Sequence, residues 1–230
     1  MIKIIHGENI IQSRDELVRD LRLAKKDSHL TRLSAKKLTL ASLEQALSSA
    51  SLFGDKLMVV IEELHSLPKS TKKNQLISLL ATFSTDPELQ IILWEKRTLT
   101  PTMVKKFPRA KVLEYKASSH IFAWLDALSS DKKTLASQLR LLEKAISSDG
   151  EQMCFVLIAR QIRLLIKAKE NKLIKEHPFV IKKVTSQARL FNLEQLLSIH
   201  HQLVDIDCRQ KTSTNWLSLK AELDLLLTSM

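Results

Sequence analysis

The feature that most constrains the fold is a change in hydrophobic rhythm halfway along the chain. Up to Tyr115, short apolar runs rich in β-branched residues alternate with segments in which apolar residues recur every three or four positions. The short runs are residues 2–7, 29–34, 56–61, 89–95 and 110–115. Because strands that alternate with helices are joined by right-handed crossovers, this half predicts an α/β domain with a parallel five-stranded sheet and flanking helices.

After Tyr115 every apolar segment has helical periodicity, and the pattern requires no further strand. The segments are separated by short breakers such as Ser148-Asp149-Gly150 and His177-Pro178. We therefore expect two domains, an α/β domain at residues 1–117 and an all-helical domain at residues 118–230. For the first helix, Ser13 followed by Glu16 has the spacing of a capping box and predicts a helix that starts at Ser13.

Composition limits the partners and the compartment. A formal net charge of +11 favours an acidic partner, such as nucleic acid or an acidic protein surface. No apolar run is long enough to span a membrane and no signal peptide is visible, so we expect no membrane association. The two cysteines, Cys154 and Cys208, are too few for a disulfide framework, and we interpret each as a small, buried or half-buried apolar residue. A cytoplasmic protein is expected.

The loop after the first strand is unsuited to binding a nucleotide. A phosphate loop needs several glycines and then lysine with serine or threonine, whereas the sequence here is HGENIIQSRD, with one glycine and the acidic Glu8. We therefore expect no catalytic residue and no cofactor. Glu62 and Glu63 follow the third strand, where a phosphate-loop ATPase keeps its magnesium-binding and water-activating acids, and we interpret them as a solvated strand end.

No metal site is expected. His200 and His201 are adjacent on a helix and therefore point about 100° apart, and no third ligand has usable spacing. Basic residues do gather on one helical stripe, where Arg160, Arg163 and Lys167 follow the spacing i, i+3, i+7. This stripe could face DNA phosphate, or it could be the solvated face of an amphipathic helix. Low aromatic content argues against a platform that stacks single-stranded bases.

An apolar pair, Leu52-Phe53, stands directly before a Gly54-Asp55 turn and the third strand. Turns usually carry polar residues, so the pair either folds back into the core or is presented to a partner. The residue pattern alone favours burial in the core, because apolar pairs are most often buried.

Several segments in a common order resemble the delta subunit of the bacterial DNA polymerase III clamp loader. They are IIHGEN, SLFGDKLMVVIEEL, ILWEKR, IFAWLDAL, FVLIARQIRLLIKAK, HPFVIKKVTSQARLFNLEQL and LVDIDCRQKTS. The resemblance covers nearly the whole chain but departs from the family at one point. That family places a small helical lid between its AAA+-like domain and its collar, and here the lid is missing or reduced to a linker.

The resemblance implies a non-catalytic, non-ATPase subunit of the polymerase holoenzyme that takes part in DNA replication. Such a subunit binds the beta sliding clamp and opens it so that it can be loaded onto primed DNA. It implies that Leu52 and Phe53 form the apolar wedge that enters the clamp, and that residues 118–230 are an oligomerisation collar. ATP-binding sibling subunits would complete a hetero-oligomer that contacts DNA. The alternative hypothesis is a stand-alone basic DNA-binding protein, related to delta but without the lid.

Overall fold

The structure is a computed structural model that describes residues 1–24, 28–48, 56–83, 86, 88–172, 176–214 and 216–230. The chain forms two compact units, Met1–Ala117 and Ser118–Met230. Each unit has its own core and is described by itself.

The N-terminal unit is built on a five-stranded sheet. Its strands are β1 (Ile2–His6), β2 (Ser28–Ser34), β3 (Lys56–Glu62), β4 (Leu89–Glu95) and β5 (Lys111–Glu114). The strand order is β2-β3-β4-β1-β5 and every neighbouring pair is parallel. In the register of the inner strands, Ile4 lies opposite Leu93 on one side and Val112 on the other. The predicted parallel five-stranded sheet is confirmed.

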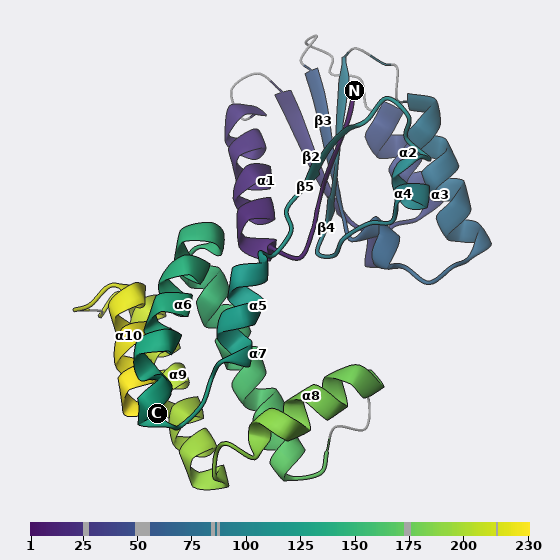
Figure 1. Cartoon of the computed structure of the whole chain (residues 1–230). Coiled ribbons are helices and arrows are strands. Elements are labelled where there is room, and N and C mark those ends of the chain that lie inside the picture. Colours follow the sequence, from purple (N-terminus) through teal and green to yellow (C-terminus); the bar gives the residue numbers. More distant parts are fainter. Residues whose placement is uncertain (25–27, 49–55, 84–85, 87, 173–175, 215) are drawn as a thin grey trace. The chain divides into compact units, whose positions relative to one another are not determined.

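Helices cover both faces of the sheet. Figure 1 shows α1 (Ile10–Ala24) on one face and α2 (Leu40–Ser48), α3 (Thr71–Thr82) and the short α4 (Pro101–Val104) on the other. Two 3-10 turns, η1 (Ala35–Lys37) and η2 (Leu64–Ser66), lie in the connections.

Successive residues of a strand point to opposite faces, and this alternation explains the two cores. Met58 and Val60 of β3 pack in the core under α1, whereas Val59 and Ile61 pack in the core under α2 and α3. The inner strands are therefore apolar on both faces, as expected for a buried parallel sheet.

The start of α1 differs from the prediction. The helix begins at Ile10, and the side-chain oxygen of Asn9 accepts a hydrogen bond from the Gln12 amide at 3.1 Å. Ser13 is a buried residue inside the helix, and its hydroxyl donates to the Ile10 carbonyl at 3.1 Å. The predicted capping box at Ser13 and Glu16 is therefore wrong, because Asn9 caps the helix one turn earlier.

The described residues of the C-terminal unit form helices joined by short loops, with no strand among them. Its helices are α5 (Ser119–Asp126), α6 (Leu135–Asp149), α7 (Glu151–Lys169), α8 (Pro178–Ala188), α9 (Leu193–Thr212) and α10 (Leu219–Ser229), with a 3-10 turn η4 (Lys132–Thr134) before α6. The predicted breakers mark real boundaries: α6 ends at Asp149, and α8 begins at Pro178 after a His177 cap. Trp124 of α5, Ile158 of α7 and Leu223 of α10 are each fully buried, and α7 packs against both α5 and α10.

Residues 115–118, all of them described, are the whole connection between β5 and α5. This connection contains no helix, so the lid that the resembled family places at this point is absent from it. Ser118 caps α5, and its amide donates to the Asp149 carboxylate at 3.0 Å. Among the described helices, none is both long enough and apolar enough to cross a membrane.

Candidate functional site

The first place to look for a site is the carboxyl edge of the sheet between β4 and β1. The chain leaves β1 towards β2 and leaves β4 towards β5, so these two neighbouring strands send their connections in opposite directions. Parallel α/β sheets bind ligands in the crevice that such a divergence opens. His6 ends β1 and Glu95 ends β4, and both side chains are buried.

This crevice is filled by the protein itself. The Leu99 amide donates to His6 Nδ1 at 3.3 Å, and Leu99 is only 4% exposed. The backbone of Tyr115 closes the other side: its amide donates to the His6 carbonyl at 2.8 Å, and its carbonyl accepts from the Asn9 amide at 2.9 Å. Gly7 has φ +137°, and a Cβ built on it would lie 2.0 Å from the Tyr115 carbonyl oxygen. A phosphate has no room in this contact.

The amides at the start of α1 are also in use. The Gln12 amide donates to the Asn9 side chain and the Ile10 amide donates to the Glu8 carbonyl at 3.0 Å. Phosphate binding at a helix N-terminus relies on such amides being available to the ligand. The loop after β1 is therefore a structural turn that fixes β1 to the chain after β5.

Glu62 and Glu63, predicted to be a solvated strand end, are both ion-paired. The Glu62 carboxylate accepts from Arg14 at 2.9 Å and from Arg32 at 2.7 Å. Burial alone would raise the pKa of Glu62, but the hydrogen bonds from these two arginines outweigh it and hold the pKa below its ordinary value. Glu63 has a left-handed backbone and pairs with Lys96. The prediction is corrected in this respect: these carboxylates tie the sheet edge to neighbouring elements.

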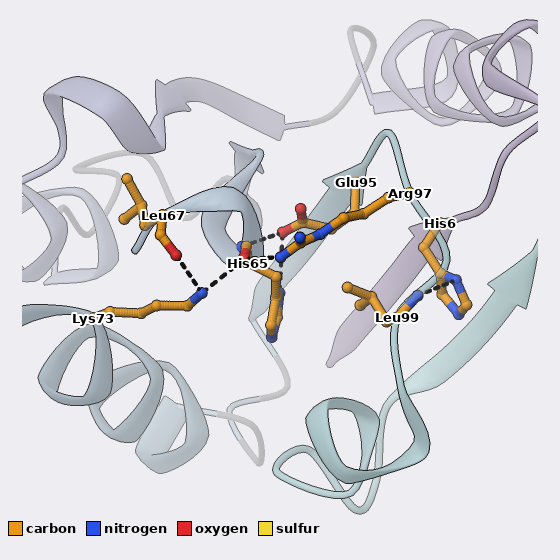
Figure 2. Close-up of polar contacts among 7 residues, drawn as sticks. All are labelled: His6, His65, Leu67, Lys73, Glu95, Arg97 and Leu99. Carbon is orange, nitrogen blue, oxygen red and sulfur yellow. Dashed lines mark hydrogen bonds and ion pairs between the residues drawn. The ribbon is translucent and has the colours of Figure 1, made fainter. Parts of the chain in front are cut away.

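A buried polar cluster lies beside the filled crevice (Figure 2). Glu95 is fully buried, and its Oε1 accepts from the His65 amide at 2.6 Å and lies 3.0 Å from His65 Nδ1. Lys73 donates to the carbonyls of His65 and Leu67, each at 2.7 Å, and Arg97 also donates to the His65 carbonyl. Burial, followed by the nearby Arg97 charge, lowers the pKa of Lys73.

This cluster holds η2 against the end of β4. His65 and Glu95 are 1% and 0% exposed, so the pair is closed to a substrate. Within the described part of the chain, Glu95 Oε2 and His65 Nε2 have no hydrogen-bond partner. The cluster was missed by sequence reasoning, and its one signal was an acid as the last residue of an apolar strand, in Leu93-Trp94-Glu95.

Leu52 and Phe53, the predicted clamp-binding residues, lie outside the described residues. What the structure does describe is the strand that follows them. β3 begins at Lys56, and the five residues from Leu57 to Ile61 are all buried between the helical layers. In the sequence, Leu52 and Phe53 are therefore followed by one of the most buried strands of the sheet.

The predicted basic stripe does form one exposed face of α7. Arg160, Arg163 and Lys167 are exposed, whereas Ile158 and Ile162 on the opposite side are fully buried. The Arg163 Nε donates to the Ala159 carbonyl at 3.2 Å. Among the residues that the structure describes, none of the three cations pairs with a carboxylate.

The two cysteines and the adjacent histidines of the C-terminal unit lie on α7 and α9. Cys154 is buried, and burial raises the pKa of its thiol to about 12, which keeps the thiol protonated at neutral pH. Cys208 is exposed, so its predicted burial is wrong. His200 and His201 point to different parts of the α9 surface, and the described residues contain no group of three metal-binding side chains.

The helical unit is the part of the chain that is similar to a known family. Residues 118–228 match the family described as the C-terminal domain of the DNA polymerase III delta subunit. The match covers α5 to α10 and begins at Ser118, where the second compact unit begins. The C-terminal unit is therefore similar to the C-terminal domain of that family.

One solved structure among those similar to this chain is the DNA clamp loader delta protein of Bacillus subtilis. The two sequences are 16% identical, the match covers 99% of this chain and 94% of that one, and the TM-score is 0.47. No curated protein sequence matches this chain significantly.

Proposed function

We propose that this chain is a clamp-loader subunit without catalytic activity of its own, which binds a sliding clamp and helps to open it for loading onto primed DNA. The observation that carries the proposal is the match of residues 118–228 to the C-terminal domain of the delta family. In this proposal the C-terminal unit joins sibling subunits that bind ATP, and the N-terminal unit binds the clamp.

The filled crevice supports the non-catalytic part of the proposal. Tyr115 and Leu99 close the place where a parallel sheet of this order would receive a nucleotide, and Glu62 is held by two arginines. A fluorescent ATP analogue with Mg²⁺ tests this directly by anisotropy on the isolated chain. We expect no saturable binding at concentrations typical of cellular nucleotide, and saturable binding would contradict this part of the proposal.

Leu52 and Phe53 are the proposed contacts with the clamp. The support is the resemblance of SLFGDKLMVVIEEL to the delta family and the buried strand that follows the pair. Burying two such side chains contributes roughly 3 to 6 kcal/mol before the costs of association, which is enough for a two-residue anchor.

The test is surface plasmon resonance against the immobilised sliding clamp from the same source. Leu52→Ala with Phe53→Ala should weaken binding by roughly a hundredfold or more, with an unchanged circular dichroism spectrum. Leu23→Ala is the matched control, because Leu23 is a leucine of the same unit that is 70% exposed. Unchanged affinity in the double variant would reject the anchor, and equal losses in the control would reject its specificity.

The alternative, a stand-alone DNA-binding protein, is supported by one observation: the exposed stripe of Arg160, Arg163 and Lys167, which has no carboxylate partner in the described part of the chain. If this stripe contacts phosphate, DNA binding should depend less on salt when the three residues are replaced with glutamine. The slope of log K against the logarithm of the salt concentration should become shallower by about one for each residue. DNA affinity that does not respond to the replacements would count against a direct role of the stripe.

A further inference from the structure

Helix α9 carries two apolar stripes, although packing into one core requires only one. The buried stripe consists of Leu196, Ile199, Leu203 and Ile206. The second stripe consists of Leu193, Leu197 and Val204, which are 38%, 43% and 46% exposed, with His200 between them at the same helical spacing. Leucine and valine at heptad-like positions on a solvent-facing stripe are typical of a helix that contacts another helix.

The second stripe borders a groove between α9 and α7. The groove has a volume of about 280 Å³, and its lining includes Val156, Ala159 and Arg163 of α7 and His200, Val204 and Asp207 of α9. Val156 is 45% exposed, so both walls present aliphatic side chains to the solvent. The groove and the second stripe of α9 together form what we call the α7–α9 face.

The charges on the two sides of this face are opposite. On the α7 side lie the exposed Arg160, Arg163 and Lys167, without a carboxylate partner among the residues that the structure describes. On the outer side of α9 lie the exposed Glu194 and Asp205. Asp207 lines the groove, and its ion pair is with Lys211 at 2.6 Å.

We propose that the α7–α9 face binds an amphipathic helix of a different protein, with acidic residues on the flank that meets α7. The apolar stripe of that helix would cover Val156, Leu197 and Val204, and its acids would pair with Arg160 and Arg163. From Leu193 to Asp207 the face extends about 21 Å at 1.5 Å per residue, so about four turns of helix would cover it. The proposal concerns the C-terminal unit alone and does not depend on clamp binding.

Two other occupants fit the face less well. A nucleic-acid backbone would satisfy the cations but offers little apolar surface to cover the exposed valines and leucine. A second copy of this chain would bring together two proteins that each carry a net charge of +11, and the resulting repulsion opposes association. An acidic-flanked helix satisfies both the apolar and the charged parts of the face.

The test uses the full chain and a fluorescein-labelled, hydrocarbon-stapled helical peptide of about 18 residues. The peptide has leucines at heptad a and d positions, glutamates along one flank and lysines along the other. In fluorescence anisotropy, Val156→Ser with Val204→Ser, and separately Arg160→Glu with Arg163→Glu, should each weaken binding by roughly tenfold or more. Lys132→Glu with Lys133→Glu is the matched control, because both lysines are exposed and the change in net charge is the same.

A peptide with its glutamates and lysines exchanged makes the test sharper. It should bind the wild-type chain more weakly and regain affinity for the Arg160→Glu, Arg163→Glu variant, which a merely structural defect would not allow. Equal binding of both peptides to all variants would overturn the proposal. It would also be overturned if the chain bound labelled DNA but not the peptide, with the same arginines required, or if sedimentation showed that the face joins two copies of the chain.

Discussion

Oε1 of Glu95 lies 2.6 Å from the backbone nitrogen of His65 and 3.0 Å from Nδ1 of the same residue, thirty positions earlier in the chain. One buried carboxylate at the end of β4 thus fixes both the backbone and the ring of the segment that leaves β3. Lys73 and Arg97 hold the carbonyl of the same histidine, so β4, α3 and the loop after β4 all contact this one residue of η2.

Replacing Glu95 should therefore destabilise the N-terminal unit. Glu95→Ala leaves the His65 amide buried without its acceptor and removes the negative charge near Lys73, and we expect a loss of roughly 3 kcal/mol in the free energy of unfolding. Glu95→Gln is the matched variant, because its amide oxygen can still accept from His65, and it should lose less. Urea denaturation measures both, and equal losses would show that the hydrogen bond to His65 is not the stabilising contact.

Gly7→Ala should be among the most damaging single changes in the chain. The new Cβ would overlap the Tyr115 backbone, and φ at this position is +137°, so we expect a loss of at least about 3 kcal/mol. Gly150→Ala separates the two causes, because Gly150 has φ +84° but nothing within 4 Å of its built Cβ. That variant should lose only the conformational cost of about 1 to 3 kcal/mol. If Gly7→Ala cost no more than Gly150→Ala, the close approach of Tyr115 would be irrelevant to stability.

The ion pairs of Lys3 make stability depend on pH. Lys3 of β1 bonds Glu16 at 2.7 Å and Asp20 at 2.6 Å, and the bond from Lys3 holds the pKa of Glu16 below its ordinary 4.5. A depressed carboxyl pKa contributes stability that is present above about pH 4.5 and is lost as the pH falls through the folded-state value. We expect the free energy of unfolding to fall with acidification in this range.

Lys3→Met supplies the comparison for this pH dependence. Without the ammonium group the half-buried carboxylates lose their partner, so the fall in stability between about pH 5 and pH 3 should become smaller or reverse. The measurement is urea denaturation at a series of pH values. If both proteins had the same pH profile, the loss of stability at acid pH could not be assigned to the ion pairs of Lys3.

Gln187 should be a key residue of the C-terminal unit. Its amide group donates to the carbonyls of Leu125 at 2.7 Å and Leu128 at 3.2 Å, where α5 ends, and its oxygen accepts from Gln161 at 2.6 Å. Gln187→Leu would leave these buried groups unpaired, and we expect a loss of roughly 2 to 4 kcal/mol. Gln152→Leu on the exposed side of α7 should change stability by less than about 0.5 kcal/mol. Comparable effects of the two changes would argue against a structural role for the Gln187 network.

The sheet was predictable because buried parallel strands have a distinctive composition. Leu57–Ile61 is apolar at every position, and such runs are recognisable without knowledge of their neighbours. The start of α1 was not predictable from the sequence, because Ser13 and Asn9 are both good capping residues. The choice between them depends on Tyr115, whose carbonyl binds the Asn9 amide from more than a hundred positions away.

The candidate sites also include some features that could be predicted from the sequence and others that could not. The basic stripe on α7 was predicted because helical spacing alone places Arg160, Arg163 and Lys167 on one face. The groove beside the stripe could not be predicted, because the groove exists only where α9 packs against α7. The cluster around Glu95 likewise joins segments that are far apart in sequence. The role of Leu52 and Phe53 stays a prediction, because it depends on a partner protein.

The contact between Gly7 and Tyr115 has a consequence for how this domain can evolve. Substitutions after β1 that introduced glycines, a lysine and a serine would give the loop the sequence motif of a phosphate loop. The Tyr115 carbonyl would still occupy the space that a phosphate needs. Nucleotide binding at this edge would require the chain to take another route after β5, where residues 115–118 now connect the strand to α5. Substitutions in the loop alone could therefore not create a phosphate site, because the backbone after β5 would have to move as well.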